Sequence, residues 1–133
     1  MTGEQLVWAL QGATTEIAPE AIFGYEIESA LAQFTAEPVE ALTSALEEAL
    51  RNSLLHAGDA NRTVHVRVAA DAVHVDVLDD GYGFEPSEVP SNRLGISQSI
   101  LGRMRALDGG DADIVSERGV GTRVVMRFTV EAP

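Results

Sequence analysis

Three polar side chains at helical spacing are the first residues in this sequence that could carry chemistry. Glu48, Asn52 and His56 recur every four residues, so on a helix they would share one face, nearly opposite a leucine-rich face. An amide oxygen is a hard, neutral ligand for Mg²⁺, and an imidazole N–H can donate to a phosphate oxygen. These residues are compatible with a surface for magnesium and phosphate, but taken alone they are more typical of an ordinary solvent-exposed helix face.

A second candidate lies where an alternating stretch of valines runs into aspartate and glycine. Asp79 and Asp80 end this stretch, and Gly81 and Gly83 follow them. A carboxylate at the end of a strand can accept a hydrogen bond from an exocyclic amine, and glycines let the backbone approach a flat ring closely. The pattern indicates a ligand-binding loop, unless it is a turn built from the usual turn-forming residues.

Two further glycine motifs follow, Arg93-Leu94-Gly95-Ile96 and Gly119-Val120-Gly121-Thr122. In the first motif the glycine opens an expected helix, and the free N–H groups at a helix N-terminus readily receive phosphate. A helix that starts at a convenient glycine is an equally simple explanation. The second motif is also typical of a glycine-rich hairpin connection.

The composition excludes several classes of protein and site. The 133 residues hold 21 acidic and nine basic side chains, which gives a formal charge of −12, and 45% of the residues are hydrophobic. This excess of acid argues against a broad surface for nucleic acid or anionic lipid. Because there is no cysteine, disulfides, thiolate zinc sites and cysteine nucleophiles are excluded. The length predicts one domain, and no apolar run approaches the ~20 residues that cross a bilayer. The absence of cysteine fits an intracellular compartment, and we expect the cytoplasm.

The first half of the chain predicts a short helix, a strand and one long helix. The short helix covers residues 4–11, alone or as the end of a longer upstream helix, and residues 12–22 are predicted to be irregular. We expect a strand over residues 25–31. Apolar residues at helical spacing then predict a helix over residues 37–56 that stops near Gly58.

The second half predicts two hairpins separated by a loop and a helix. Strands are expected over 64–68 and 73–77, a loop over 80–95, a helix over 96–107, and strands over 114–117 and 122–130. Alternation with period two assigns one valine face of the first hairpin to the core, and it assigns Val124, Met126, Phe128 and Val130 of the second hairpin to the core as well. Trp8 is expected to pack in the core with its apolar neighbours. The pattern predicts one α/β sandwich, with two helices covering a sheet made largely of hairpins.

Taken together and in this order, the four motifs resemble the GHKL superfamily of ATP-binding domains, which share the Bergerat fold. Residues 48–57 resemble its N box, Asp79-x-Gly81-x-Gly83 its G1 box, Leu94-Gly95-Ile96 its G2 box, and Gly119-x-Gly121-Thr122 its last glycine box. The resemblance covers about residues 37–130. Each motif is weak alone, but four motifs in order and at sensible spacing make the resemblance strong.

Within the superfamily, the sequence is most similar to the catalytic domain of bacterial sensor histidine kinases of the nitrate-sensor type. The phrases EEALRNSLLHAG, LGISQSILGRMRALDGG and ERGVGTRVVMRF carry this similarity. Two positions depart from the wider pattern. His56 stands where lysine is frequent elsewhere, as is common in this subfamily, and Gly102-Arg103-Met104-Arg105 replaces the usual arginine-glutamate phrase, which leaves the role of each arginine open.

The resemblance implies a role for each motif residue. Asp79 would accept a hydrogen bond from the adenine amine, with a water molecule assisting, and Thr122 would lie near the adenine. Glu48 and Asn52 would be the catalytic residues. Asn52 would bind Mg²⁺, with Glu48 beside it as a second candidate ligand, and His56 would hold phosphate oxygens. The remaining residues of the implied ATP site are Gly81, Gly83, Arg93, Leu94, Gly95, Ile96, Gly119 and Gly121.

The resemblance also implies the architecture. A Bergerat fold is a two-layer α/β sandwich, in which helices cover one face of a mixed, largely antiparallel sheet. We expect residues 23–133 to form this catalytic domain. Residues 1–22 would be an N-terminal segment that either folds with the domain or ends an upstream helix.

The implied function is that of a two-component sensor histidine kinase. Its catalytic domain binds Mg²⁺-ATP and donates the γ-phosphoryl group to a histidine on a separate dimerisation domain, and a response regulator is the next partner. We expect the isolated domain to be a monomer that neither phosphorylates itself nor binds nucleic acid, and the parent kinase to be a homodimer. Whether the parent is anchored in the inner membrane stays open.

Two other functions stay open. A stand-alone serine kinase of the anti-sigma-factor type shares the fold and roughly this length, and it acts first by sequestering a sigma factor. A degenerate module would bind partners and no nucleotide, but the intact Asn52, Asp79 and glycine motifs weigh against it. The residues after the G2 box resemble the histidine kinases better, so a histidine kinase is the preferred interpretation.

Overall fold

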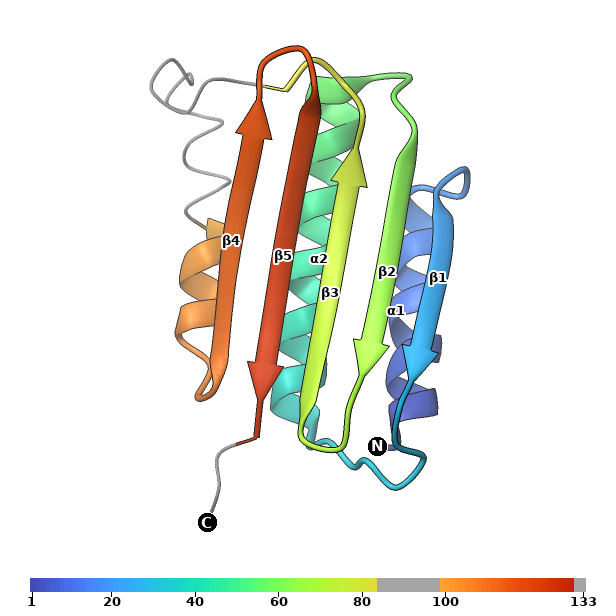
Figure 1. The fold of residues 1–133 in the computed structure, drawn as a ribbon, viewed down its shortest axis with the longest axis vertical. Coiled ribbons are helices and arrows are strands. Elements are labelled where there is room, and N and C mark those ends of the chain that lie inside the picture. Colours follow the sequence, from blue (N-terminus) through green and yellow to red (C-terminus); the bar gives the residue numbers. More distant parts are fainter. Residues whose placement is uncertain (84–98, 131–133) are drawn as a thin grey trace.

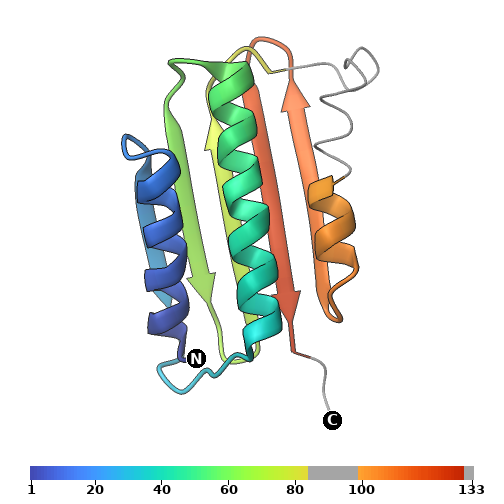
Figure 2. The same cartoon turned by 180° about the vertical axis from the view of Figure 1, so that it is seen from behind.

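A five-stranded sheet with helices packed on one of its faces makes up the computed structural model of the chain, which describes residues 1–83 and 99–130 (Figures 1 and 2). The elements are α1 (Gly3–Ile17), β1 (Ile22–Ile27), α2 (Ala36–Ala57), β2 (Arg62–Val68), β3 (Ala72–Asp79), β4 (Gly110–Glu117) and β5 (Gly121–Thr129). A further helix over residues 99–105 precedes β4. The two layers confirm the predicted α/β sandwich.

The sheet is mixed, with the strand order β1-β2-β3-β5-β4. β1 runs parallel to β2, whereas the other three pairs of neighbours are antiparallel. Two parallel neighbours need a crossover connection, and α2 supplies it by running back along the helical face of the sheet (Figure 2). This largely antiparallel sheet with helices on one face is the architecture that the sequence predicts.

Alternating apolar residues fill the space between the two layers. Successive side chains of a strand point to opposite faces, so every second residue of the central strands faces the helices. There they meet the leucines of α2. The set comprises Leu42, Leu46, Leu50, Val64, Val66, Val68, Val73, Val75, Val77, Val124, Met126 and Phe128. All of these residues are buried, which confirms the predicted core face of the first hairpin and, except for Val130, that of the second.

The long helix α2 confirms the helix predicted over residues 37–56. Thr35 stands before it with an extended backbone, and Pro38 occupies the first turn, where its missing N–H costs no hydrogen bond. The helix stops at Gly58, as predicted for this helix breaker. The polar and apolar faces expected from the sequence therefore run along one continuous helix.

Helix α1 is longer than predicted, because it continues to Ile17 through a segment that the sequence predicts to be irregular. Thr14 donates its hydroxyl to the carbonyl oxygen four residues earlier at 2.9 Å and is buried. This bond satisfies the hydroxyl inside the helix, and the exposed Gly12 costs only about 1 kcal/mol relative to alanine. A capping box between Thr2 and Gln5 fixes the start of the helix.

Strand β1 lies closer to the N-terminus than the predicted strand over residues 25–31. Its register with β2 explains both limits. Ile22 pairs with Thr63, and Ile27 pairs with Val68, which is the last residue of β2. β1 therefore ends where its partner ends, a limit set by another strand and invisible in the local sequence.

Two residues expected in the core lie at the surface. Trp8 is 62% exposed, whereas its neighbours Leu6, Val7 and Leu10 are buried as predicted. Helix α1 lies at the edge of the helical layer, so one of its faces meets the core and another meets solvent (Figure 2). Val130 is exposed because it lies one residue beyond the end of β5.

The last hairpin is confirmed, but its first strand is longer than predicted. β4 begins at Gly110 instead of residue 114, and it pairs with β5 as far as Phe128. The preceding helix ends at residue 105, earlier than the predicted 107, which leaves enough chain to turn and start the strand. Ile100 and Met104 are buried, in agreement with the predicted apolar face of that helix.

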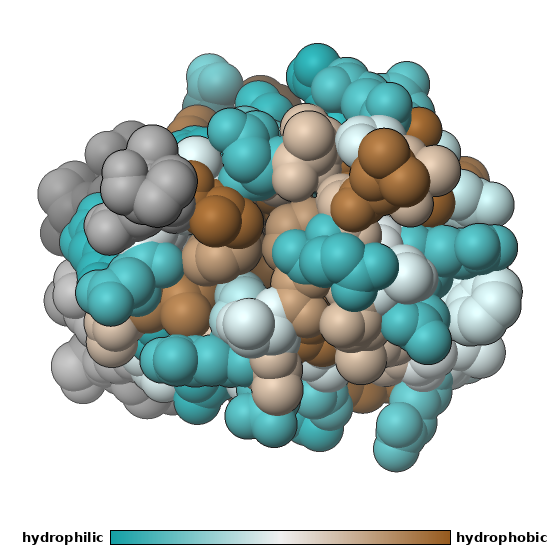
Figure 3. Space-filling model, turned by 90° about the horizontal axis from the view of Figure 1, so that it is seen from below, coloured by the Kyte–Doolittle hydropathy of each residue, from teal (hydrophilic) through white to brown (hydrophobic). Residues whose placement is uncertain are grey.

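The end of the sandwich where β2 ends and β3 starts has a mixed surface. Figure 3 shows hydrophobic residues there in small groups between hydrophilic ones. Among the described residues, no helix is long and apolar enough to cross a membrane. Asp79 and Thr122, two of the motif residues that the structure describes, lie at the opposite end, where β3 ends and β5 begins.

Candidate functional site

The motif residues that the structure describes meet where α2 and β3 end and β5 begins. Asp79 and Thr122 are direct partners across β3 and β5. Ser53, which follows Asn52 on α2, donates its hydroxyl to Asp79 Oδ2 at 2.9 Å and so joins the helix to the sheet. Thr122 is buried, and its hydroxyl lies 3.0 Å from that of Ser116. Three elements that are distant in sequence thus bring these groups together.

The predicted phosphate-binding motif lies outside the described residues. Arg93, Leu94, Gly95 and Ile96 fall between residues 83 and 99, the two ends of the described ranges. The loop predicted over 80–95 is described only at its start, and the helix predicted from residue 96 is described from residue 99. The role of this motif stays a prediction.

A buried arginine that the sequence analysis missed lies behind the site. Arg62 is the first residue of β2 and is 3% exposed, and a guanidinium carries five N–H donors. Nε donates to Ser53 Oγ at 2.8 Å, Nη1 to Ala60 O at 3.0 Å and to Glu20 Oε1 at 3.2 Å, and Nη2 to Ser53 O at 3.0 Å and to Gly58 O. The sequence could have indicated this burial, because Arg62 lies an even number of residues from the inward-facing valines of β2 and so shares their face of the strand.

Asp79 is held through both of its carboxylate oxygens. Oδ2 accepts the hydrogen bond from Ser53, and Oδ1 accepts one from the backbone N–H of Gly81 at 3.1 Å. Because the Nε–H of Arg62 donates to Ser53 Oγ, the serine hydroxyl is left to donate to Asp79. A carboxylate offers about four lone-pair positions, so Asp79 can still accept a hydrogen bond from a ligand.

The adjacent Asp80 has different partners. Its Oδ1 accepts the backbone N–H of Asn61 at 2.7 Å, and its Oδ2 accepts the side-chain amide of the same residue at 2.8 Å. The side-chain hydrogen bond from Asn61 is the main cause that lowers the pKa of Asp80 below its ordinary value. Asp80 ties the start of β2 to the end of β3, whereas Asp79 turns toward α2.

Two loops meet at this end of the sheet through glycine backbone. Gly83 has a φ of 64°, and a Cβ atom there would stand 2.1 Å from the carbonyl oxygen of Glu117. Gly121 has a φ of 139°, and its Cβ would stand 2.1 Å from the carbonyl oxygen of Asp79. The N–H of Gly119 joins the same two loops by a hydrogen bond of 2.6 Å. These glycines therefore have a packing role apart from any contact with a ligand.

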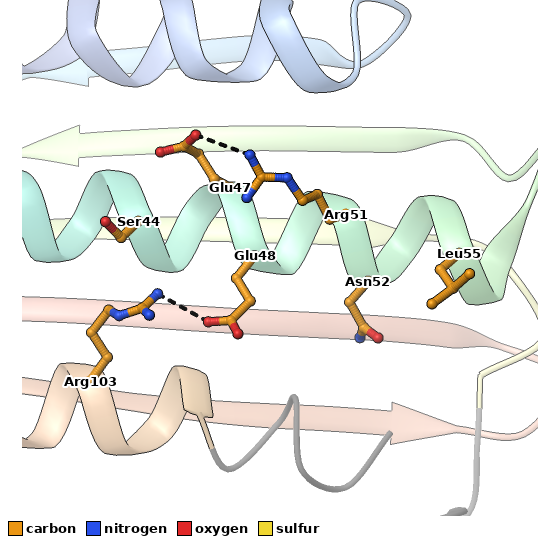
Figure 4. A pocket seen from close by; sticks show the side chains of 7 residues that line it. All are labelled: Ser44, Glu47, Glu48, Arg51, Asn52, Leu55 and Arg103. Atoms are coloured by element: carbon orange, nitrogen blue, oxygen red, sulfur yellow. Dashed lines mark hydrogen bonds and ion pairs between the residues drawn. The ribbon is translucent and has the colours of Figure 1, made fainter. Parts of the chain in front are cut away.

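The polar stripe of α2 is not a uniformly solvated face. Asn52 is 8% exposed, and its Oδ1 is buried without a hydrogen-bond partner among the described residues. Glu48 accepts hydrogen bonds from Arg103 Nη1 at 3.0 Å and from Ser99 Oγ at 3.4 Å, both on the helix that precedes β4 (Figure 4). His56 is half-buried. A buried oxygen without a donor is costly, so Asn52 fits a cation or a donor supplied by a ligand.

Two neighbouring hollows flank the stripe. One has a volume of about 430 Å³ and is lined by Ser44, Glu47, Glu48, Arg51, Asn52, Leu55 and Arg103 (Figure 4). The other has a volume of about 660 Å³ and is lined by residues 55–60, residues 80–82 and Gly119. In the described ranges, no group of three histidine, aspartate or glutamate side chains could hold a metal ion.

A protein-family model covers most of the chain. The family is described as "Histidine kinase-, DNA gyrase B-, and HSP90-like ATPase", and its model matches residues 38–132. This range holds all four motifs discussed above. No curated protein matches the chain.

Solved structures of histidine kinases are similar to the chain. The histidine kinase domain of the blue-light activated histidine kinase EL346 from Erythrobacter litoralis has a TM-score of 0.59 at 19% identity, over 96% of this chain and 60% of that one. A second structure of that kinase has a TM-score of 0.61 at 17% identity, over 96% of this chain and 41% of that one. The catalytic domain of histidine kinase ThkA has a TM-score of 0.65 at 13% identity, over 97% of this chain and 93% of that one. At such identities the likeness concerns the fold alone, and the chain spans less than two thirds of the first two proteins.

Proposed function

The chain belongs to the histidine kinase-, DNA gyrase B- and HSP90-like ATPase family, and on this premise we propose that it is the ATP-binding catalytic domain of a two-component histidine kinase. In this proposal it binds Mg²⁺-ATP where α2, β3 and β5 meet. The observation that carries the proposal is the meeting of three elements at that end of the sheet: Ser53, the neighbour of Asn52 on α2, donates to Asp79, and Asp79 pairs with Thr122.

In the proposed site, Asp79 recognises the base. Ser53 and Gly81 fix its two oxygens, and a remaining lone pair accepts a hydrogen bond from the exocyclic amine of adenine. Thr122 pairs with Asp79 across the sheet and contributes its hydroxyl beside the base. A base without an exocyclic amine would leave Asp79 without this donor, which is how the site would select adenine.

The stripe of α2 is proposed to face the phosphates. The buried Oδ1 of Asn52, which lacks a partner among the described residues, suits Mg²⁺, a cation that prefers oxygen ligands. Glu48 and His56 lie on the same side of α2 and would contact the metal and the phosphate oxygens. A bound Mg²⁺ would neutralise phosphate charge during transfer. Arg93, Leu94, Gly95 and Ile96 would complete the phosphate contacts.

The phosphoryl acceptor is proposed to be a histidine on a separate dimerisation domain. In-line transfer needs donor and acceptor a few ångströms apart and correctly oriented. His65 and His74 lie on the face of the sheet turned away from the helices, and His56 lies on the proposed phosphate-binding stripe. The chain's three histidines are therefore poorly arranged to receive the γ-phosphoryl group, so the chain should not label itself.

Isothermal calorimetry with Mg²⁺-ATP tests the binding step. We expect a measurable heat of binding and an increase in melting temperature with millimolar Mg²⁺-ATP, because a ligand that binds only the folded state stabilises it. A titration with Mg²⁺ alone serves as the control. If neither heat nor a thermal shift appears at millimolar nucleotide, the proposed function is wrong.

Radiolabelled ATP tests the transfer step. The chain incubated alone with γ-labelled ATP should stay unlabelled, and label should appear when the helical dimerisation domain of a histidine kinase is added. That label should be lost in acid, as expected of phosphohistidine. Acid-stable labelling of an added protein on serine would favour the serine-kinase alternative, and labelling of the isolated chain would contradict the division of labour proposed here.

A further inference from the structure

Arg62 is the one buried charged side chain in the described residues. Burying a charge is costly unless its partners replace water. The single carboxylate among its partners belongs to Glu20, whose side chain is 53% exposed, and the other four acceptors are neutral oxygens. The guanidinium is thus satisfied mainly as a hydrogen-bond donor.

Four of the five contacts of Arg62 are explained by anchoring. Three join it to backbone carbonyl oxygens: that of Ser53 near the C-terminal end of α2, and those of Gly58 and Ala60 just beyond the helix. The fourth, to Glu20, holds the segment between α1 and β1. Anchoring does not explain the bond from Nε to Ser53 Oγ, because the backbone carbonyl of Ser53 already receives its own hydrogen bond from Nη2.

The bond to Ser53 Oγ determines which way the serine hydroxyl donates. An arginine can only donate, so Ser53 Oγ is the acceptor at 2.8 Å, and its own hydrogen is directed to Asp79 Oδ2 at 2.9 Å. Without Arg62, the hydroxyl could rotate and donate to other acceptors nearby. The carboxylate of Asp79 would then lose one of its two fixed contacts.

We propose that Arg62 is a positioning residue for base recognition. Through Ser53 it holds the Asp79 carboxylate in one orientation, so that the remaining lone pair points to the exocyclic amine of the base. The inference rests on the proposed function, in which Asp79 accepts that amine. We call Arg62, Ser53 and Asp79 the Arg62 relay.

The experiment compares two nucleotides that differ in the amine alone. Calorimetry measures the affinity for ATP and for purine riboside triphosphate, which lacks the exocyclic amine, in the unchanged chain and in Ser53→Ala, Arg62→Gln and Asp79→Asn. Arg67→Gln is the matched control, because it makes the same substitution on the same strand at an exposed ion pair with Glu28. Circular dichroism and thermal melting establish which variants fold.

The unchanged chain should bind ATP about tenfold or more tightly than the analogue, because a lost hydrogen bond to a charged group costs about one decade or more. Ser53→Ala should reduce this preference by about fivefold while the affinity for the analogue stays within about twofold. Arg62→Gln should act in the same direction, and Arg67→Gln should keep the full preference. Should Arg62→Gln fail to fold, Ser53→Ala still tests the relay, because it leaves the arginine and its carbonyl contacts in place.

The outcomes separate this inference from the proposed function. If Asp79→Asn abolishes the preference while Ser53→Ala keeps it, the relay does not position Asp79 and the inference is wrong, but the proposed function stands. Equal losses for both nucleotides in Ser53→Ala would likewise reduce the relay to a structural anchor and overturn the inference. If the unchanged chain binds both nucleotides equally well, Asp79 does not recognise the amine and the inference is wrong, whereas absence of any ATP binding would overturn the proposed function itself.

Discussion

The two halves of the proposed nucleotide site differ in how far their polar groups are satisfied before a ligand binds. At the base half, Asp79 has hydrogen bonds to both oxygens, and the buried Arg62 behind it has acceptors for all five donors. At the phosphate half, Oδ1 of Asn52 is buried without a partner in the described residues. Glu48 is tied instead to Arg103, whose side chain is 40% exposed.

This difference indicates that folding completes one half and leaves the other to the ligand. A carboxylate fixed by two neighbours recognises a donor without further rearrangement, which lowers the entropic cost of binding. A buried oxygen without a partner costs about 1–3 kcal/mol, and a bound cation or donor would recover that cost. We therefore expect base recognition to depend on geometry, and phosphate binding to depend on the cation.

The largest effect is expected for Asp79→Asn, which attacks the completed half. The amide presents a donor where the carboxylate presents an acceptor, so the adenine amine loses its partner. The loss should be ~1–3 kcal/mol, or about one to two decades of affinity for ATP. Calorimetry with Mg²⁺-ATP measures it, and ATP affinity equal to that of the unchanged chain would show that Asp79 does not contact the base.

The next effect is expected for Asn52→Ala, at the incomplete half. This variant should lose about tenfold in affinity for Mg²⁺-ATP and much less for ATP with a chelator present, because Asn52 acts through the metal. Without nucleotide, its free energy of unfolding should not fall by more than about 0.5 kcal/mol, since the deleted oxygen has no partner in the described part of the chain. An equal loss of affinity with and without Mg²⁺ would contradict the metal assignment.

A smaller effect, on stability alone, is expected from Asp80→Asn. The pKa of Asp80 is lowered by the hydrogen bonds from Asn61, so the ionised form stabilises the fold above the ordinary aspartate pKa of about 4. That contribution is lost as the pH falls through the lowered pKa. Urea unfolding should find Asp80→Asn less stable than the unchanged chain at pH 7, with the gap closing below about pH 4. A gap of constant size across this range would exclude the ionised carboxylate as its cause.

The smallest effect is expected at Trp8, on α1 and distant in sequence from both halves. Trp8→Phe should change the free energy of unfolding by no more than about 0.5 kcal/mol, because the side chain is 62% exposed. As the single tryptophan of the chain, Trp8 should fluoresce like a solvated indole, and Mg²⁺-ATP should leave its emission unchanged. A shift on adding nucleotide would mean that ligand binding rearranges α1, which the completed base half does not require.

The parts of the fold that the sequence predicts well are those with strong local periodicity. Valines at every second position predict β2 and β3, and apolar residues at helical spacing predict α2, because in each case one face of the element must enter the core. The hairpins follow, since short connections force antiparallel pairing.

The parts that the sequence predicts poorly depend on contacts between distant segments. The limits of β1 are set by the length of β2, and the length of α1 depends on an internal hydrogen bond of Thr14 that satisfies its hydroxyl. The exposure of Trp8 depends on the position of α1 at the edge of the layer. None of these causes is visible in a window of a few residues.

The sequence predicted the motif residues of the candidate site, but not the buried arginine that lies behind them. Asp79 and Thr122 are paired across the sheet, and Asn52 faces a buried environment, although the roles of all three stay predictions. Arg62 was missed because a single arginine at the start of a strand resembles a surface residue. It nevertheless lies on the same face of β2 as the inward-facing valines. A charged residue at such an inward position indicates a buried hydrogen-bond network.

The parallel pairing of β1 at the edge of the sheet also bears on the order in which the molecule opens. Ile22 pairs with Thr63, and the chain between these two residues includes the whole of α2. In contrast, β2 with β3 and β4 with β5 form hairpins that short turns close. Closing a long segment costs more conformational entropy, so contacts of this kind form late in folding. The amide hydrogens of β1, and of α1 packed against it, should therefore exchange with solvent through partial openings that leave the antiparallel strands intact.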